Sequence, residues 1–298
     1  MSDHERLWTP WRMRYIAGEA KEDGCIFCNR LAGTDDVASL ILLRGKHSFV
    51  IMNLFPYNTG HIMIVPNQHA ADPGELDTAT VHEMAEFLPV CTRALRRVLN
   101  CDGFNVGFNV GDVAGAGIAA HLHQHVVPRW VGDANFMPII ASTVAMPELI
   151  PVTYAKTRLE LEREISGDHP CRVLLLLHDD QDLLLHHNDL PEVQPQPDVP
   201  VWLTAVRAVP DGITDLEIAG WGGTTRTAGT WPSAQAGQPK AGIVMRGKVG
   251  TEIDDAYRAV MVRDATATVS PEENHGLLTN LAALAPSVAA PLPGDQFG

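Results

Sequence analysis

The first part of the chain alternates short apolar runs with one long amphipathic stretch. The runs KHSFVIMN (46–53) and HIMIV (61–65) have the length of β-strands, and the LFPYNTG segment between them is rich in turn-forming residues. Between Glu75 and Asn100, apolar residues recur at steps of three and four, which predicts a helix. Pro89 should kink or split it because proline has no backbone N–H. The apolar face consists of Val81, Met84, Leu88, Cys91, Leu95 and Val98.

A third β-type stretch follows this helix. GFNVGFNV leads through the glycine-rich segment GDVAGAGIAA into GIAAHLHQHVVPRWV (117–131), where every second residue of the central part is histidine. A polar helix is expected at about 153–165. Strands that flank one long helix predict an α+β fold, with an antiparallel sheet and packed helices.

The sequence changes character near residue 168. RVLLLL and DLLLHH lie on either side of the polar segment HDDQ, which predicts a β-hairpin. A chain of 298 residues is also long enough for two domains. We therefore expect one domain over 1–168 and a second, smaller α/β or α+β domain over 169–298.

Composition excludes some classes of partner. The formal net charge is −14 and both halves are acidic, which argues against nucleic acid and anionic membranes, because these need a basic surface. No apolar stretch approaches the roughly 18 residues of a membrane span. The five cysteines follow no disulfide spacing, so we expect a cytoplasmic protein.

Three histidines alternate in the HLHQH stretch. Because alternate side chains of a strand share a face, His121, His123 and His125 should line one face. A half-exposed strand would explain a single histidine better than three. A metal site is one functional interpretation. Attack of a neutral imidazole on a phosphate is the other, and the glycine-rich approach with Asn105 and Asn109, which offers hydrogen-bond donors, favours it.

Several motifs in this order resemble the histidine triad (HIT) superfamily. They are RLWTPWRMRYI, CIFC, FVIMNLFPYNTGHIMIVPNQH, GFNVGFNVGDVAGAGIAAHLHQHVVPRW and GDANFMPII, and they span about residues 5–165. The chain is similar to the bacterial branch with diadenosine tetraphosphate phosphorylases and hydrolase-like proteins. The resemblance implies a nucleotidyl hydrolase or transferase that acts on the α-phosphate of dinucleoside polyphosphates or other adenylylated compounds. It also implies a covalent nucleotidyl-histidine intermediate and no catalytic metal, and we expect a homodimer.

The resemblance assigns roles to individual residues. His123 would be the nucleophile, His125 would contact the phosphate and the leaving oxygen, and His61 would lie beside the nucleophile. Asn53 would bind ribose hydroxyls. The residues that would cradle phosphate are Asn109, Gly115, Gly117 and Ile118.

The resemblance also suggests a structural zinc ion. Cys25 and Cys28 form a Cys-x2-Cys pair, which by itself is equally compatible with a redox motif or with two buried thiols. Some family members complete such a pair with a histidine after the GHxxxVP segment and with the first triad histidine. Here these positions hold His69 and His121, so we expect Zn at Cys25, Cys28, His69 and His121.

Three positions depart from the family pattern. Gln124 replaces an apolar residue, Ala120 an acidic one, and Gly117 a serine of the phosphorylases. The missing serine leaves both water and phosphate as acceptors. Two further readings stay open: a nucleotidyl transferase with an unusual acceptor, and a nucleotide-binding sensor with little turnover.

The second half resembles Nudix domains only distantly. Nudix hydrolases hold magnesium with several glutamates on one helix. The corresponding stretch VPVWLTAVRAVPDGI contains no glutamate. We therefore expect an accessory domain without chemistry of its own.

Overall fold

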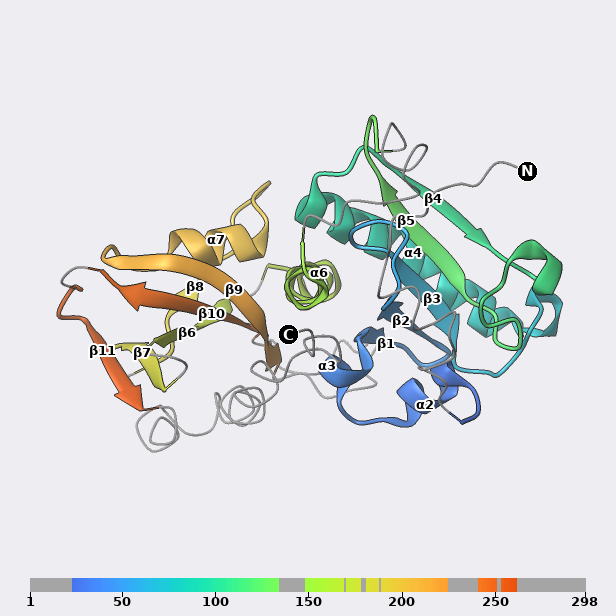
Figure 1. Cartoon of the computed structure of the whole chain (residues 1–298), viewed down its shortest axis with the longest axis horizontal. Helices are drawn as coiled ribbons and strands as arrows, with labels where there is room; N and C mark the ends of the chain where they lie inside the picture. Colours follow the sequence, from blue (N-terminus) through green and yellow to red (C-terminus); the bar gives the residue numbers. More distant parts are fainter. Residues whose placement is uncertain are drawn as a thin grey trace, which may run out of the picture. The chain divides into compact units, whose positions relative to one another are not determined.

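The chain folds into two compact units, Met1–Thr153 and Tyr154–Gly298, in the computed structural model (Figure 1). The structure describes residues 23–133, 148–168, 170–177, 181–187, 189–224, 241–250 and 253–261. The RLWTPWRMRYI motif and most of GDANFMPII lie outside these residues. We expected the first domain to end at residue 168. The division falls instead within helix α6 (Ile150–Ser166), most of which is grouped with the second unit.

An antiparallel five-stranded sheet forms the centre of the first unit. Its strand order is β1-β2-β3-β5-β4, and all neighbouring strands pair antiparallel. Together with the helices that pack on it, this sheet confirms the predicted α+β fold. The strands are β1 (Ile41–Arg44), β2 (Ser48–Met52), β3 (Ile62–Pro66), β4 (Gly103–Phe108) and β5 (Gln124–Arg129).

The two faces of this sheet are covered by different helices. Helix α4 (Thr78–Leu99) contacts β2, β3 and β5 (Figure 1). On the other face, Phe27 of α2 (Ile26–Ala32) packs with strand residues into an apolar cluster. The strand residues of this cluster are Ile41, Phe49, Ile51, Met63 and Val65. His125 is the cross-strand partner of Met63, so it lies on the α2 face, because directly paired residues share a face.

Arg44 ties the short helices to the sheet. Its Nε lies 2.7 Å from the carboxylate of Asp36 in α3 (Asp36–Ser39). Its Nη1 and Nη2 donate to the carbonyl oxygens of Leu31 and Gly33, at 2.6 and 2.7 Å. These bonds satisfy carbonyls at the end of α2, which an α-helix leaves without internal partners. Arg44 therefore holds the helix that carries Cys28.

Helix α4 confirms the predicted amphipathic helix with two differences. Met84, Cys91, Leu95 and Val98 are buried as expected, but Val81 is 44% exposed. The helix also runs through Pro89 without a break. Proline deprives the carbonyl of Ala85 of its donor, and both residues lie on the exposed face, where water can satisfy that oxygen.

The Glu83 carboxylate, buried on α4, closes the turn between β1 and β2. It accepts hydrogen bonds from the backbone N–H groups of Lys46, His47 and Ser48 and from the Ser48 hydroxyl, at 2.5–2.9 Å. We expect Glu83→Gln to lower the free energy of unfolding by about 2–4 kcal/mol, because an amide NH2 then faces these donors. Urea unfolding of the full chain measures the effect. Glu86→Gln, at an exposed position of the same helix, is the control and should change little.

A second sheet domain follows in the second unit. Its main order is β11-β7-β6-β10-β9, with β8 paired to β6. Strands β6 and β7 form the predicted hairpin, whereas β10 runs parallel to β6. Helix α7 (Val201–Arg207) carries no carboxylate. The strands are β6 (Cys171–Leu177), β7 (Asp182–His186), β8 (Glu192–Val193), β9 (Ile213–Thr224), β10 (Ala241–Val249) and β11 (Tyr257–Met261).

Candidate active site and metal-binding cluster

The three alternating histidines lie at the beginning of β5. The strand starts at Gln124, so only His125 of the three is within it, and His121 occupies a bend before it. Our expectation of a strand through all three histidines was therefore too long. The backbone N–H of Leu122 donates to the carbonyl of Ala70 at 2.6 Å, outside the sheet ladder. This bend lets His121 face a different set of residues from His123.

His123 is buried and its neutral tautomer is determined by one hydrogen bond. Its Nδ1 lies 2.8 Å from the carbonyl oxygen of His121. Because a carbonyl only accepts, Nδ1 carries the hydrogen and Nε2 keeps its lone pair. Burial lowers the pKa of His123, partly offset by this hydrogen bond, so the ring is neutral near pH 7. A neutral ring with an unprotonated Nε2 can act as a nucleophile.

His61 and His125 form a second chain of hydrogen bonds with a defined direction. The backbone N–H of Tyr57 donates to His61 Nδ1 at 3.1 Å, so this nitrogen is an acceptor. His61 Nε2 must then carry the hydrogen, and it lies 2.9 Å from His125 Nδ1. His125 Nδ1 accepts in turn, which leaves the hydrogen of neutral His125 on Nε2. This ring therefore offers a donor beside His123, whose ring centroid lies 4.8 Å away.

Burial keeps both rings of this pair uncharged. It lowers the pKa of His61 to about 3, with a further contribution from His125 and His123. Burial also lowers the pKa of His125 to about 4, helped by His123. Both histidines are neutral at physiological pH, so their tautomers depend on hydrogen bonds alone.

Asn53 lies next to His61. Its side-chain Nδ2 is 3.2 Å from His61 Nδ1, and its Oδ1 accepts from the backbone N–H of Phe55 at 2.9 Å. Asn53 thus supports the same His61 tautomer as Tyr57 does. Its predicted contact with ribose stays a prediction.

The predicted phosphate loop lies between β4 and β5. Asn109 is half-buried just after β4, and Gly115 has a φ of +81°, in the left-handed region that favours glycine. Gly117 is exposed, whereas Ile118 packs on the Phe27 cluster. The phosphate-binding role of these residues stays a prediction.

Gln124 follows the nucleophile candidate but points away from it. Side chains alternate along a strand, so Gln124 lies on the opposite face from His123 and His125. It pairs with Ile64 of β3 and Phe108 of β4 and is half-buried. A polar residue at this position leaves the histidine face unchanged.

Four potential metal ligands meet beside the histidines. The ligand atoms of Cys25, Cys28, His69 and His121 all lie within 4.8 Å of one another. His121 Nδ1 is 3.2 Å from Cys25 Sγ and 3.6 Å from Cys28 Sγ. Cys28 Sγ is 3.3 Å from His69 Nδ1. Ligand atoms around a tetrahedral zinc are about 3.3–3.8 Å apart, given the usual Zn–S and Zn–N bond lengths. The cluster therefore fits such an ion.

The hydrogen bond on the far side of His121 agrees with a ligand role. His121 Nε2 lies 2.9 Å from the carbonyl oxygen of Pro66, to which it donates. The lone pair of the neutral ring is then on Nδ1, the atom that faces the cysteines. Metal-bound histidines usually donate their second N–H in this way.

Three residues around His61 were not predicted from the sequence. Tyr57 was not singled out, although its ring lies 4.8 Å from that of His61 and 5.7 Å from that of His125. Asn58 and Asp133 were not singled out either, although their side chains meet 3.0 Å apart. The alternation of aromatic, polar and glycine residues in FPYNTG gives no sign of these contacts. Only the Arg129–Asp133 spacing in PRWVGD hints at an ion pair.

Comparison with known proteins agrees with the histidine arrangement. A sequence model of the HIT domain matches residues 35–131. The chain is 37% identical over 167 residues to the AP-4-A phosphorylase of Mycobacterium tuberculosis, which covers 54% of this chain and 86% of that protein. The chain belongs to the HIT family. This confirms the resemblance seen in the motifs.

Two other HIT proteins match part of the chain. An uncharacterised HIT-like protein of Saccharolobus solfataricus is 28% identical over 113 residues, which are 38% of this chain and 79% of that protein. A solved structure of a Zn-bound histidine triad family protein from Mycobacterium smegmatis is 26% identical, with a TM-score of 0.40, over 47% of this chain and 94% of that one.

Among the described residues of this HIT protein, no helix has the length and apolar content needed to cross a membrane.

Proposed function

We propose that this HIT protein cleaves dinucleoside polyphosphates, or related adenylylated compounds, at the α-phosphate through a nucleotidyl-His123 intermediate. The observation that carries the proposal is the pair of hydrogen-bond chains. They leave a lone pair on His123 Nε2 and a hydrogen on His125 Nε2. A nucleophile and a donor side by side match displacement at phosphorus. Similarity to the AP-4-A phosphorylase of M. tuberculosis supports the substrate class.

The first step exchanges one bond at phosphorus for another. The His123 Nε2 lone pair forms the N–P bond, while the bond from phosphorus to the bridging oxygen breaks. The departing polyphosphate keeps the electron pair as an oxyanion, and the His125 Nε2–H stabilises it by a hydrogen bond. In the second step an oxygen of phosphate or water attacks the same phosphorus. The N–P pair returns to His123 Nε2, and with water the extra proton leaves to solvent.

We propose that Cys25, Cys28, His69 and His121 hold a structural zinc ion. Four protein ligands complete a tetrahedral site, which leaves no position for substrate. The ion would cross-link α2 to the segment before β5. His121 would link it to the reaction site, because its carbonyl holds the Nδ1–H of His123. In our proposal no metal ion takes part in the chemical steps.

We further propose a homodimer in the cytoplasm, without nucleic acid or membrane partners. Strand β4 is an edge of the first sheet, and its outer part exposes apolar side chains, including Val106 at 42% and Phe108 at 39%. Such an edge suits pairing with a second copy. All five cysteines are free thiols, which suits a reducing compartment. The acidic net charge of −14 argues against polyanionic partners.

The proposed activity is tested by the products from diadenosine tetraphosphate. We expect ATP and ADP, formed only when inorganic phosphate is present, because the similar mycobacterial protein is a phosphorylase. Formation of ATP and AMP without phosphate would instead assign water as the acceptor. The glycine at position 117, where the phosphorylases have a serine, is an argument for water. Chromatography of both reactions separates the two. Tight nucleotide binding without turnover would contradict an enzyme and favour a sensor.

A further inference from the structure

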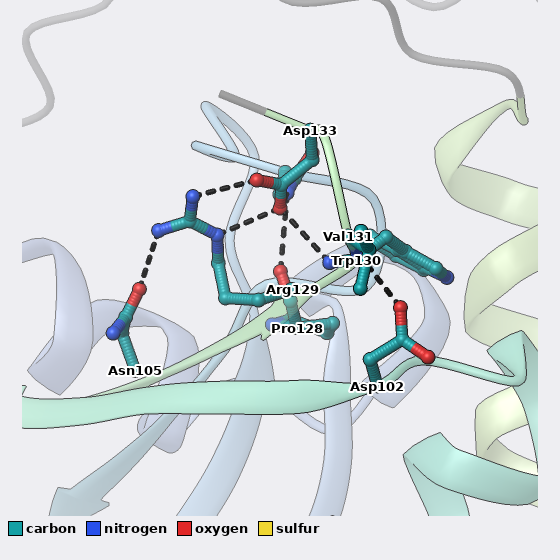
Figure 2. A network of polar contacts seen from close by, with 8 residues as sticks. Asp102, Asn105, Pro128, Arg129, Trp130, Val131 and Asp133 are labelled. Carbon is teal, nitrogen blue, oxygen red and sulfur yellow. Dashed lines mark hydrogen bonds and ion pairs between the residues drawn. The ribbon is translucent and has the colours of Figure 1, made fainter. Parts of the chain in front are cut away.

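The turn after β5 contains a polar network that the proposed steps do not use (Figure 2). Arg129 donates two hydrogen bonds to the carboxylate of Asp133, from Nε at 2.7 Å and from Nη2 at 2.6 Å. Its Nη1 donates to Asn105 Oδ1 at 2.6 Å. Hydrogen bonds from Arg129, joined by weaker interactions with Trp130 and Asn58, lower the pKa of Asp133 to about 2, so the carboxylate is charged. Because the guanidinium makes these bonds, we assign Arg129 to this network and not to phosphate binding.

Asp133 connects this turn to the loop before β3. Its Oδ2 accepts from the backbone N–H of Trp130 and from Asn58 Nδ2, both at 3.0 Å. Asn58 Nδ2 also donates to the carbonyl of Pro128 at 3.1 Å. The side-chain amide of Asn58 in the loop thus donates to two acceptors, the Asp133 carboxylate and the Pro128 carbonyl. Charge-assisted bonds of this kind are stronger than neutral ones.

The same loop determines the state of His61. The backbone carbonyl of Asn58 accepts from the N–H of His61 at 3.1 Å, and the neighbouring Tyr57 N–H donates to His61 Nδ1. Within this loop Leu54 is 40% and Tyr57 46% exposed, while Phe55 and Pro56 are half-buried. The polar link through Asn58 is one constraint on the position of the Tyr57 N–H, beside the contact of the Tyr57 ring with His61.

We propose that Asp133 is a positioning residue for the His61–His125 pair, acting through Asn58. By holding the loop, it keeps the Tyr57 N–H on His61 Nδ1. The hydrogen of His61 is then on Nε2 and is donated to His125, and the hydrogen of His125 is on Nε2 and is available to the leaving oxygen. The catalytic consequence of this positioning rests on the proposed function.

Alanine substitutions at the two ends of the link provide the test. Asp133→Ala removes the carboxylate, whereas Asn58→Ala removes the link and leaves the Arg129–Asp133 ion pair in place. Asp102→Ala is the matched control. Asp102 Oδ2 accepts from Val131 N–H at 2.8 Å and so supports the same turn, whereas the carboxylate that binds Asn58 is that of Asp133 (Figure 2). The double variant completes a mutant cycle.

Two measurements on the full chain read out the effect. Long-range proton–nitrogen NMR of histidine labelled with nitrogen-15 shows which ring nitrogen of His61 carries hydrogen. We expect a single Nε2–H form in the parent and in Asp102→Ala, and a mixture or a shifted Nδ1 signal in Asp133→Ala and Asn58→Ala. With diadenosine tetraphosphate, we expect kcat to fall about tenfold in both variants while KM stays within about twofold. The double variant should lose no more than either single one.

The outcomes separate the positioning role from the proposed function. An unchanged His61 spectrum in both variants, or losses in kcat that multiply in the double variant, would overturn the role of Asp133. If Asp133→Ala does not fold, Asn58→Ala decides by the same criteria. A parent that shows the expected spectra but does not cleave the substrate contradicts the proposed function and leaves the positioning of His61 intact.

Discussion

Loss of the His123 imidazole should abolish turnover of diadenosine tetraphosphate. We expect His123→Ala to reduce kcat by about four orders of magnitude or more, as removal of a covalent nucleophile does in other enzymes. Nearby rings cannot replace it in the tautomers that their hydrogen bonds select. His125 Nε2 carries a hydrogen, His61 Nε2 is directed at His125, and His121 Nδ1 faces the cysteines. Steady-state assays of the purified full chain measure this loss.

Two controls make the His123 result specific. His82→Ala changes an exposed histidine on α4 and should leave kcat unchanged. A brief reaction of the parent, stopped in alkali and examined by mass spectrometry, should show one nucleotidyl group on the peptide that contains His123, since an N–P bond is labile in acid. His123→Ala should lack this adduct. Retention of more than about one hundredth of the parental kcat would show that His123 is not the nucleophile.

Removal of one cysteine ligand should release the zinc ion. We expect Cys28→Ser to bring bound zinc from about one per chain to below about one tenth, because a hydroxyl is a far weaker ligand than a thiolate. The thermal midpoint should fall as well, since the proposed ion would cross-link α2 to the segment before β5. Elemental analysis and thermal unfolding measure the two effects. We also expect kcat to fall about tenfold, because the carbonyl of His121 orients the ring of His123.

Cys101→Ala is the matched control for the zinc experiment. Cys101 is a buried free thiol that does not belong to the four-ligand cluster. This variant should keep its zinc and its activity. Equal zinc content in Cys28→Ser and in the parent would show that the metal, if bound, lies elsewhere.

Several features of this HIT protein could be predicted from local sequence. The period of apolar residues predicted α4, and the alternation of histidines placed His123 and His125 on one face. The family motifs grouped Cys25, Cys28, His69 and His121, whose ligand atoms the structure places together. These predictions succeeded because each depends on periodicity or on a motif that is contiguous in the chain.

Other features depended on residues that are distant in sequence. Val81 follows the helical period but is exposed, because burial depends on what packs against α4 and not on the period alone. Glu83 reads as a surface residue of a helix, yet it binds a turn more than 30 residues earlier. The compact units divide within α6, at Thr153, whereas we predicted a domain boundary at residue 168 from sequence, where the contacts that group a helix with one unit are not visible.

The sequence by itself determined the family, the α+β fold of the first unit and the candidate histidines of the proposed reaction, because these follow from local patterns. Only the tertiary structure decided which nitrogen of each histidine holds its hydrogen. That depends on the Tyr57 N–H, on the carbonyl of His121 and, in our proposal, on the carboxylate of Asp133, which binds Asn58 from 75 residues further along the chain. The physical reason is that neutral imidazole has two tautomers of similar energy, and a neighbouring donor or acceptor chooses between them.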